Sequence, residues 1–371
     1  MTIDSQLRHI ISQFDFPGAL AACEAIKAGH INRTYRLRFE EAGEICGEYV
    51  LQRINTFAFK KPREVMHNVR LVTEHLCAAM EKLGRDPGNR VLRLVPVKGG
   101  GTLYEDASGS WRAYDFIANA RTVDRVDSPA QFREIGRAFG EFQSMLSDFP
   151  IEQLYDTIPY FHDTVKRMEA FERSVAADVK GRACEVGPEI AAVRARKEEM
   201  GRIVRLIEAG ELPLRVTHND TKINNVMLDA DTGAAKCVID LDTVMAGSVL
   251  YDFGDAIRYG ASTAAEDERD LSKVHLDMDL FAAYADGFIS ETARGLTRKE
   301  LELLPLGALV MTYENGMRFL TDYLDGDVYF HIENADDNLA RARCQLALLA
   351  DMEVHSDEMY RTVRELIEKY E

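Results

Sequence analysis

Cysteine is scarce in this chain, and its arrangement suits neither crosslinking nor metal binding. Six cysteines are scattered over 371 residues without a CxxC pair: Cys23, Cys46, Cys77, Cys184, Cys237 and Cys344. Disulfide scaffolds and zinc sites both use closely spaced cysteines. The spacing argues against both, and we expect reduced thiols in a cytoplasmic protein.

Long hydrophobic runs are also lacking. The longest ones, such as LPLGALVM at 304–311, fall short of the roughly 18 apolar residues that suggest a membrane span. The first residues, MTIDSQLRHIISQFDF, contain an early acid and no uninterrupted apolar core. This pattern fits an amphipathic helix better than a signal peptide, so we expect a soluble protein.

Positive charge is in deficit. Lys and Arg number 45 against 62 Asp and Glu, which gives a net charge of −17. This balance argues against nucleic acid or an anionic membrane as the main partner. A nucleotide carried with Mg²⁺ remains compatible, because the metal offsets part of the phosphate charge.

The first part of the chain is rich in residues that favour strands. Within residues 20–115, the segments 33–39, 47–54 and 90–97 carry β-branched, aromatic and aliphatic side chains and predict β-strands. One helix is expected over 60–83. Its apolar residues recur at steps of three or four and begin after a proline: Val65, Val69, Val72, Leu76 and Met80.

From about residue 128 the periodicity is helical. A buried stripe at steps of three or four predicts the first helix: Phe132, Ile135, Phe139, Phe142 and Leu146. Further helices are expected over 189–210, from a Thr297 and Glu300 capping box onward, and over 357–370. A chain of this length favours two packed lobes.

One stretch of the helical part is crowded with polar residues. RVTHNDTKINNVMLD at 215–229, with AAKCVID at 234–240, predicts a β-hairpin and contains HxDxxxxN as His218, Asp220 and Asn225. The second strand ends at Asp240. In phosphoryl transfer, a loop Asp accepts the hydroxyl proton, while an Asn and a second Asp hold magnesium. The alternative is that these residues only cap turns.

The polar stretch and its continuation resemble a family. THNDTKINNVMLD and VIDLDTVMAGSVLYDFGDAIR look like the aminoglycoside phosphotransferase and choline kinase-like superfamily. The segments GHINRTY, YVLQRIN and RFLTDYLDGDVYF resemble its N-acetylhexosamine 1-kinases most closely. The resemblance implies an α+β, protein kinase-like two-lobe fold. Residues 1–113 would form a small β-rich nucleotide-binding lobe, and residues 114–371 a larger, mainly helical lobe with the catalytic hairpin.

The resemblance also implies a role for each residue of the motif. Asp220 would be the catalytic base, Asn225 and Asp240 the Mg²⁺ ligands, and His218 a support for the loop backbone. Lys222 would reach the γ-phosphate of ATP, or else is a solvated loop lysine. Asp252, which follows in YDFGD, corresponds to an acid that ties the loop together.

The nucleotide-binding residues are less regular. Relatives carry a strand lysine paired with a helix glutamate to hold the α- and β-phosphates, whereas YVLQRIN offers Gln52 or Arg53, with Glu64 as the helix acid. Arginine binds phosphate differently from lysine. We expect Gly29 in the phosphate-covering loop and backbone contacts to the purine near Asp115 and Ile117. The implied sugar-pocket residues are His30, Asn32, Arg318 and Tyr329.

The sequence thus predicts an ATP- and Mg²⁺-dependent kinase that phosphorylates a sugar, most specifically the anomeric hydroxyl of an N-acetylhexosamine such as GlcNAc or GalNAc. Choline, homoserine and an aminoglycoside remain alternative acceptors. CVIDLDTV also fits the nucleophile motif of haloacid dehalogenase-like phosphatases, and the missing lysine suggests a non-catalytic, pseudokinase-like nucleotide-binding protein. The oligomeric state is left open.

Overall fold

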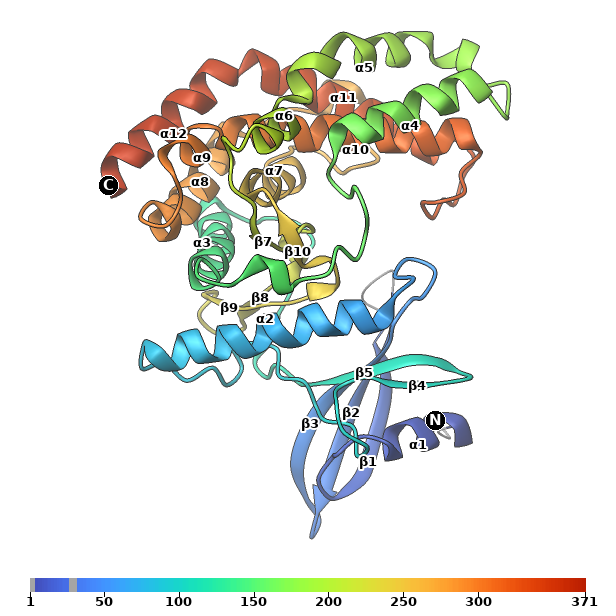
Figure 1. Cartoon of the computed structure of the whole chain (residues 1–371), viewed down its shortest axis with the longest axis vertical. Helices are drawn as coiled ribbons and strands as arrows, with labels where there is room; N and C mark the ends of the chain where they lie inside the picture. The colour runs from blue at the N-terminus through green and yellow to red at the C-terminus, as the bar shows by residue number, and fades with distance from the viewer. Residues whose placement is uncertain (1–3, 27–31) are drawn as a thin grey trace. The chain divides into compact units, whose positions relative to one another are not determined.

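The computed structural model describes residues 4–26 and 32–371 (Figure 1). The chain divides into two compact units. The first comprises Met1–Arg121, Asp148–Ile158 and Met227–Met245, and the second comprises Thr122–Ser147, Pro159–Val226 and Ala246–Glu371. Each unit draws on separate stretches of sequence. The lobe boundary expected between residues 113 and 114 stays a prediction.

The first unit is built on an antiparallel sheet with the strand order β1-β2-β3-β5-β4. Its strands are β1 (Ala19–Ile26), β2 (Arg33–Glu41), β3 (Glu44–Arg53), β4 (Tyr104–Asp106) and β5 (Gly109–Asp115). β2 and β3 confirm two of the predicted strands. Ala42 and Gly43 join them with positive φ at both positions, as a two-residue hairpin turn requires.

Alternating residues of this sheet form the core of the first unit with α1 (Ser5–Ser12). The buried members are Ile10, Ile11, Phe14, Leu37, Phe39, Leu51, Val95, Trp111 and Ala113. The side-chain period of a strand is two, so polar neighbours such as Arg38 remain outside this core.

The strand predicted over residues 90–97 is wrong. This segment makes only isolated bridges, Leu94 with Tyr114 and Val97 with Phe14. The Val95 N–H still donates to the Ala113 carbonyl at 2.9 Å. Pro96 follows directly and has no N–H to continue a ladder.

Helix α2 (Pro62–Lys82) confirms the helix predicted in this part of the chain, with its apolar stripe buried. Asn68 on α2 is fully buried, and its Nδ2 donates to the carbonyls of Tyr155 (2.8 Å) and Val244 (2.9 Å). This amide therefore joins distant segments of the unit to one helix.

The remaining elements of the first unit are η1 (Ile151–Gln153), η4 (Leu241–Thr243) and a sheet of β6 (Ala120–Arg121), β8 (Val226–Asp229) and β9 (Ala235–Val238). β8 and β9 confirm the predicted hairpin.

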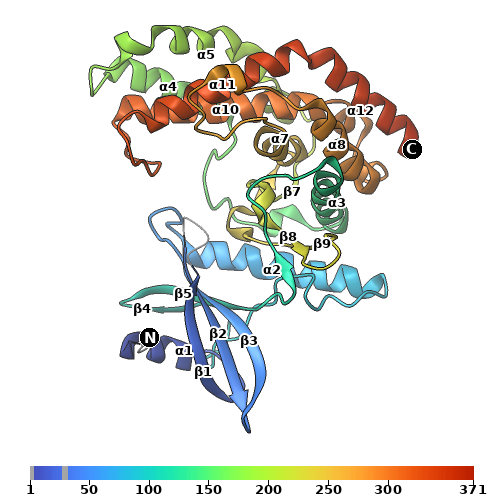
Figure 2. The same ribbon diagram turned by 180° about the vertical axis from the view of Figure 1, so that it is seen from behind.

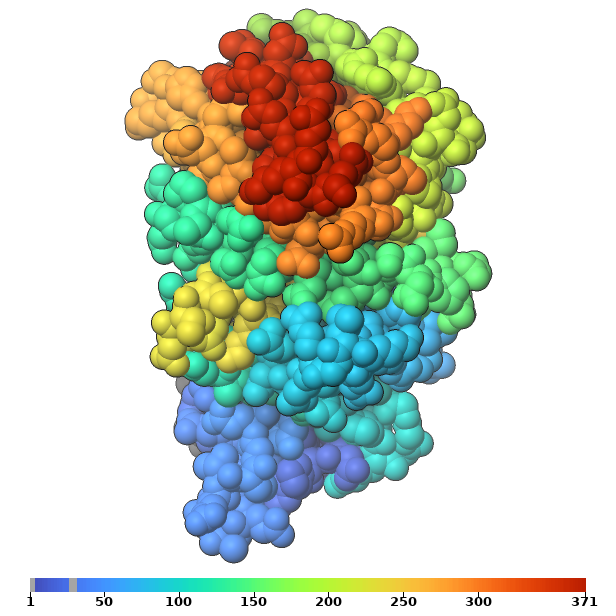
Figure 3. All heavy atoms as spheres, turned by 90° about the vertical axis from the view of Figure 1, so that its left-hand side faces the viewer, coloured from blue at the N-terminus to red at the C-terminus, as the bar shows by residue number. Residues whose placement is uncertain are grey.

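The second unit is mainly helical. Its helices are α3 (Pro129–Met145), α4 (Thr164–Ala177), α5 (Gly187–Met200), α6 (Arg202–Glu208), α7 (Val249–Gly260), α8 (Met278–Thr292), α9 (Arg298–Glu302), α10 (Leu304–Asp325), α11 (Asp337–Val354) and α12 (Ser356–Tyr370). The shorter elements are η2 (Ala183–Val186), η3 (Ile223–Asn225), η5 (Leu271–Lys273) and the paired strands β7 (Arg215–Thr217) and β10 (Met245–Gly247). α3, whose predicted stripe is buried, lies beside α8 (Figure 2). α12 packs against α8 and α9, and the C-terminal part of the chain, red in Figure 3, lies at the surface.

α10 is the central helix of this unit and packs against α4, α7 and α11. Its contact with α7 depends on two glycines. A Cβ on Gly254 would lie 2.1 Å from the Gly307 carbonyl oxygen, and one on Gly307 would lie 2.2 Å from the Leu250 carbonyl oxygen. Because only glycine permits so close an approach, α7 lies directly on α10.

Two predicted helices are interrupted. The helix expected over 189–210 divides at Gly201 into α5 and α6, since glycine is a poor interior helix residue. The capping box of Thr297 and Glu300 is confirmed, but it opens only the short α9. Pro305 in the first turn of α10 cannot continue the α9 hydrogen-bond ladder, so a new helix begins at Leu304.

Among the helices within the described ranges, none has both the length and the apolar character needed to cross a bilayer.

Candidate active site

The loop that follows β7 carries His218 and Asp220, and its backbone is held by a buried acid. Asp252, on α7, is 1% exposed and accepts the N–H groups of His218 at 2.8 Å and Asn219 at 2.7 Å. Gln143 Nε2 donates to the same carboxylate at 2.9 Å. Burial raises the pKa of Asp252. Asp252 therefore ties the loop to the helical core, as the resemblance implied.

Ring packing and a hydrogen bond of His218 also fix the start of the loop. Asn219 has a φ of +63°, in the left-handed region that non-glycine residues rarely adopt. His218 is fully buried, edge-on to the rings of Phe139 and Phe142. Its Nδ1 accepts the N–H of Asp220 at 3.3 Å. His218 thus supports the backbone immediately before the predicted base.

Asp220 presents a carboxylate that is partly accessible. Its side chain is 21% exposed, and Oδ1 lies 3.2 Å from Lys222 Nζ. Burial raises the pKa of Asp220, but the ammonium of Lys222 opposes it and the net pKa lies below the ordinary value. The same pairing raises the pKa of Lys222. At neutral pH, Asp220 is therefore an anion that can accept a proton, with a cation beside it.

Asn225 closes the other end of the loop. Its side chain is nearly buried, and Nδ2 donates to the backbone carbonyl of Asp220 at 2.7 Å. Its N–H donates to the Lys222 carbonyl at 2.9 Å. With Nδ2 engaged, Oδ1 is the atom that would meet a cation. Asp220, Lys222 and Asn225 are therefore brought together, as their spacing predicted.

Asp240 belongs to the first unit and lies two residues after the end of β9, where it precedes η4 with a φ of +59°. It has the position along the chain that the hairpin predicted. A cation shared by Asn225 and Asp240 stays a prediction. Within the described ranges, no group of three or more His, Cys, Asp and Glu side chains suits a metal ion.

The acid two residues later has a different role. Asp242 is 2% exposed and forms an ion pair with Arg112, which lies on β5 and is 1% exposed. Asn32 Nδ2 also donates to Asp242, at 2.9 Å, and Asn32 Oδ1 accepts the Asn55 N–H at 2.9 Å. The predicted sugar-pocket residue Asn32 thus has both side-chain atoms engaged within the first unit.

Arg112 is a buried cation that the spacing of the motifs did not predict. Gln52 Oε1 accepts hydrogen bonds from Arg112 Nε at 3.1 Å and from Nη2 at 2.9 Å. Glu64 pairs instead with Lys61, at 3.0 Å, and Arg53 lies against Gly109. The signal in the sequence was an arginine within the apolar strand SWRAY. An arginine whose side chain points into the core needs a buried partner.

Two backbone N–H groups at the end of β5 already have partners within the first unit. The N–H of Asp115 donates to the Arg93 carbonyl at 2.9 Å, and that of Phe116 donates to the Glu48 carbonyl at 3.0 Å. Burial raises the pKa of the Asp115 carboxyl. Ile117 is buried. The predicted purine contact therefore rests on Ile117 for its backbone donor.

The other two sugar-pocket residues lie near each other in the second unit. The guanidinium of Arg318, on α10, lies 5.6 Å from the ring centroid of Phe161 and 5.5 Å from that of Phe330. Tyr329 is 58% exposed and packs edge-on against Phe330. Asp322 accepts the N–H of Tyr329 at 2.8 Å. Gly29 and His30 lie outside the described residues.

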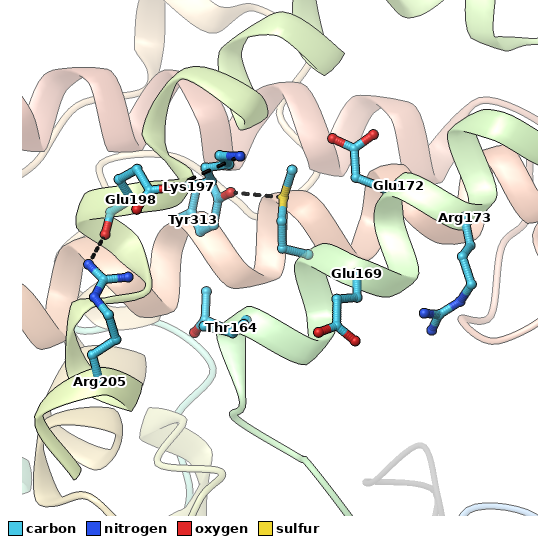
Figure 4. A pocket seen from close by; sticks show the side chains of 10 residues that line it. Thr164, Glu169, Glu172, Arg173, Lys197, Glu198, Arg205 and Tyr313 are labelled. Atoms are coloured by element: carbon cyan, nitrogen blue, oxygen red, sulfur yellow. Dashed lines mark hydrogen bonds and ion pairs between the residues drawn. The ribbon is translucent and has the colours of Figure 1, made fainter. Parts of the chain in front are cut away.

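A cavity of about 510 Å³ lies elsewhere in the second unit, between α4, α5, α6 and α10. Figure 4 shows its lining, with Thr164 at the start of α4 and Tyr313 on α10. The Tyr313 hydroxyl donates to the Val193 carbonyl at 3.0 Å. Opposite charges line its rim, among them Glu169, Arg173 and Glu198. None of the predicted site residues lines this cavity.

The chain is similar to known phosphotransferases and kinases. A model of the phosphotransferase enzyme family matches residues 22–296. A microcompartment-associated aminopropanol kinase superposes with a TM-score of 0.60 at 17% identity, covering 96% of this chain and 98% of that one. Choline kinase from Cryptosporidium parvum Iowa II gives 0.61 at 14% identity, covering 98% and 99%. A spectinomycin phosphotransferase in complex with ADP and spectinomycin gives 0.56 at 12% identity, covering 96% and 100%.

Identities this low show the fold alone. These neighbours share a protein kinase-like architecture, so the predicted α+β fold class is confirmed. The antiparallel sheet of the first unit and the helices of the second are its two characteristic parts.

Proposed function

This chain belongs to the phosphotransferase enzyme family, and from that premise we propose that it transfers the γ-phosphoryl group of ATP to a hydroxyl of a hexose derivative. The acceptor we favour is the anomeric hydroxyl of an N-acetylhexosamine. The chain is in any case a phosphotransferase that acts on a hydroxyl of a small molecule.

The observation that carries the proposal is the anchored loop around Asp220. Its carboxylate is ionised, partly accessible and 3.2 Å from Lys222. Asp220 would orient the acceptor hydroxyl and take its proton as the phosphoryl group moves, and Lys222 would reach the γ-phosphate. A backbone held at 218 and 219 keeps this carboxylate in position without reorganisation during the reaction.

The oxygen donors of the chain fit Mg²⁺. Magnesium is usually held by one or two protein ligands together with the phosphates and water, rather than by a full protein cage. Asn225 Oδ1 and the Asp240 carboxylate would supply the protein ligands. When bound, the ion would neutralise charge on the β- and γ-phosphates.

The charges near Arg318 support a neutral acceptor. Burial, and next the charge of Arg318, lower the pKa of Arg167, so two guanidinium groups lie close to Phe161. Glu314 and Asp163 offset part of the positive charge of Arg167, but the two guanidinium groups still disfavour a cationic amino alcohol such as choline. A sugar hydroxyl or acetamido group would instead accept hydrogen bonds from Arg318, beside the exposed Tyr329.

Two other classes of function are disfavoured by particular residues. In a haloacid dehalogenase-like phosphatase the second acid of CVIDLDTV would donate a proton, whereas Asp242 is buried in an ion pair with Arg112. A non-catalytic nucleotide-binding protein has no need for an ionised base on an anchored loop, and Asp220 is one.

A screen of acceptors tests the proposal. ADP release would be measured by a coupled assay with N-acetylglucosamine, N-acetylgalactosamine, neutral hexoses, choline, homoserine and spectinomycin, and the phosphorylated position would be read by phosphorus NMR. We expect turnover with an N-acetylhexosamine and a phosphate on its anomeric oxygen. Turnover with choline alone would overturn the sugar assignment. Phosphate release from a sugar phosphate without nucleotide would overturn the kinase.

Replacing Lys222 by methionine is expected to move the acid limb of kcat/KM to higher pH. In the native chain Lys222 holds the pKa of Asp220 below its usual value against the effect of burial. Without the ammonium, burial raises that pKa, and the base becomes protonated at a higher pH. The pH profile would be measured against K273M, an exposed lysine of the same unit. An unmoved acid limb in K222M would contradict this coupling.

Replacing Asn225 by alanine is expected to raise the Mg²⁺ concentration needed for half-maximal activity. The variant removes Oδ1, the proposed ligand, together with the bond from Nδ2 to the Asp220 carbonyl. Magnesium titrations of the initial rate would be compared with N224A, which alters the neighbouring asparagine, 3.5 Å from Asp124. Superimposable titrations of N225A and the native enzyme would remove Asn225 from the metal site.

A further inference from the structure

We propose that His162, held by Glu314, is a positioning residue that fixes the peptide group preceding the catalytic base Asp220. This inference rests on the proposed function, since it assigns His162 a role in keeping Asp220 in place for proton transfer. His162 lies just before α4, is 8% exposed, and belongs with Glu314 and Asp220 to the second unit.

The contacts of His162 show which ring nitrogen carries a hydrogen. Nε2 lies 3.2 Å from the carbonyl oxygen of Asn219, and Nδ1 lies 2.8 Å from Glu314 Oε1. Because a carbonyl can only accept, Nε2 must carry a hydrogen. His162 therefore links Glu314 on α10 to the carbonyl that precedes Asp220 in the catalytic loop.

Glu314 is suited to hold this ring as an anion. It is fully buried, and its Oε2 accepts the hydroxyl of Thr164 at 3.0 Å. Burial raises the pKa of Glu314, but His162 and the guanidinium groups of Arg318 and Arg167 oppose it, and the net pKa lies below the ordinary value. Both carboxylate oxygens are thus bound at the start of α4, Oε1 by His162 and Oε2 by Thr164.

Two histidines consequently hold one peptide group at opposite ends. The carbonyl of Asn219 accepts from His162, and the N–H of Asp220 donates to His218 Nδ1 at 3.3 Å. The plane of this peptide sets the direction in which the Asp220 side chain leaves the backbone. Asn219 adopts a φ of +63°, a conformation that needs support from its surroundings. His162 supplies that support on the carbonyl side.

The ring of His162 also packs against two other aromatic rings. It lies 4.4 Å from the ring centroid of Phe161 and 5.2 Å from that of Tyr251. A phenylalanine at position 162 would keep this aromatic packing and lose both hydrogen bonds. This separates the role in positioning from the role in packing.

The experiment compares H162F with H162Q, whose amide N–H can again donate to the Asn219 carbonyl. H275F, an exposed histidine of the same unit bonded to Asp351, is the control. We measure kcat, both KM values and the thermal midpoint, with the acceptor found in the screen and with water as acceptor in ATP hydrolysis. We expect kcat of H162F to fall about 10- to 10²-fold with KM for ATP unchanged, as a misplaced catalytic group would. H162Q should recover part of this loss.

Three results would overturn the inference: kcat of H162F within twofold of the native value, an equal loss in H275F, or no recovery in H162Q. Should H162F fail to fold, T164V decides. It keeps the volume of Thr164 and removes the hydroxyl that holds Glu314, so an unchanged kcat would overturn the inference and a several-fold loss would support it. D220N separates the two proposals. If D220N is inactive while H162F is as active as the native enzyme, only the positioning role is overturned. If D220N is active, the proposed function is overturned.

Discussion

D220N is expected to lower kcat by about 10²- to 10⁴-fold, the range that a positioned general base contributes. Asparagine has nearly the same shape as aspartate but cannot take up the hydroxyl proton. The loop should persist in this variant, because its backbone is held by Asp252 and by the Nδ2 of Asn225 rather than by the Asp220 side chain. The loss should therefore appear in kcat, with the affinity for ATP nearly unchanged.

The measurement is the coupled rate of ADP formation, together with the equilibrium dissociation constant for ATP. D267N serves as a control for removing one negative charge, because Asp267 is an exposed acid of the same unit. Turnover of D220N near that of D267N would take the role of base away from Asp220. A parallel loss of ATP affinity would point to a collapsed loop instead.

R112M is expected to destabilise the first unit by about 3–5 kcal/mol, the usual cost of removing one partner of a buried ion pair. Arg112 is 1% exposed, and Asp242 2%. Without the guanidinium, the Asp242 carboxylate would keep the Asn32 amide as a donor, at 2.9 Å, but would lose its counter-charge. Gln52 would lose the donors of its Oε1 as well.

The single tryptophan of the chain reports on this effect. Trp111 precedes Arg112 on β5 and is buried in the core of the first unit, so its fluorescence during urea unfolding follows that unit. The double variant R112M/D242N removes both charges and should be more stable than R112M. A free energy of unfolding for R112M within about 1 kcal/mol of the native value would contradict a structural ion pair.

Periodic elements could be predicted because their signal is local. The stripe in α2 and the alternation in β2 and β3 repeat every three to four or every two residues, and these periods follow from backbone geometry. Residues 90–97 have strand-like composition, but Pro96 interrupts their pairing with β5. Composition alone does not reveal whether such a segment pairs with a neighbouring strand along its whole length. The divisions at Gly201 and Pro305 follow the same logic, since one residue overrides a regular pattern.

The candidate site divides in the same way. Asp220, Lys222 and Asn225 lie within six positions of one another, so a single loop brings them together and their spacing carried the prediction. The cations near the predicted nucleotide-binding residues did not follow from spacing. Arg112, rather than Arg53, is the guanidinium that meets Gln52, and its partner Asp242 is 130 positions away.

By itself, then, the sequence determined the family, the order of the elements and the polar loop after β7, because each is written in adjacent residues. Tertiary structure decided which distant groups hold that loop. Asp252 accepts the N–H groups of His218 and Asn219, and Glu314 pairs with His162, from which it is 152 positions away in the sequence. The physical reason is that a buried charge or donor must find a partner wherever the chain's path brings one, and that path depends on packing rather than on local pattern.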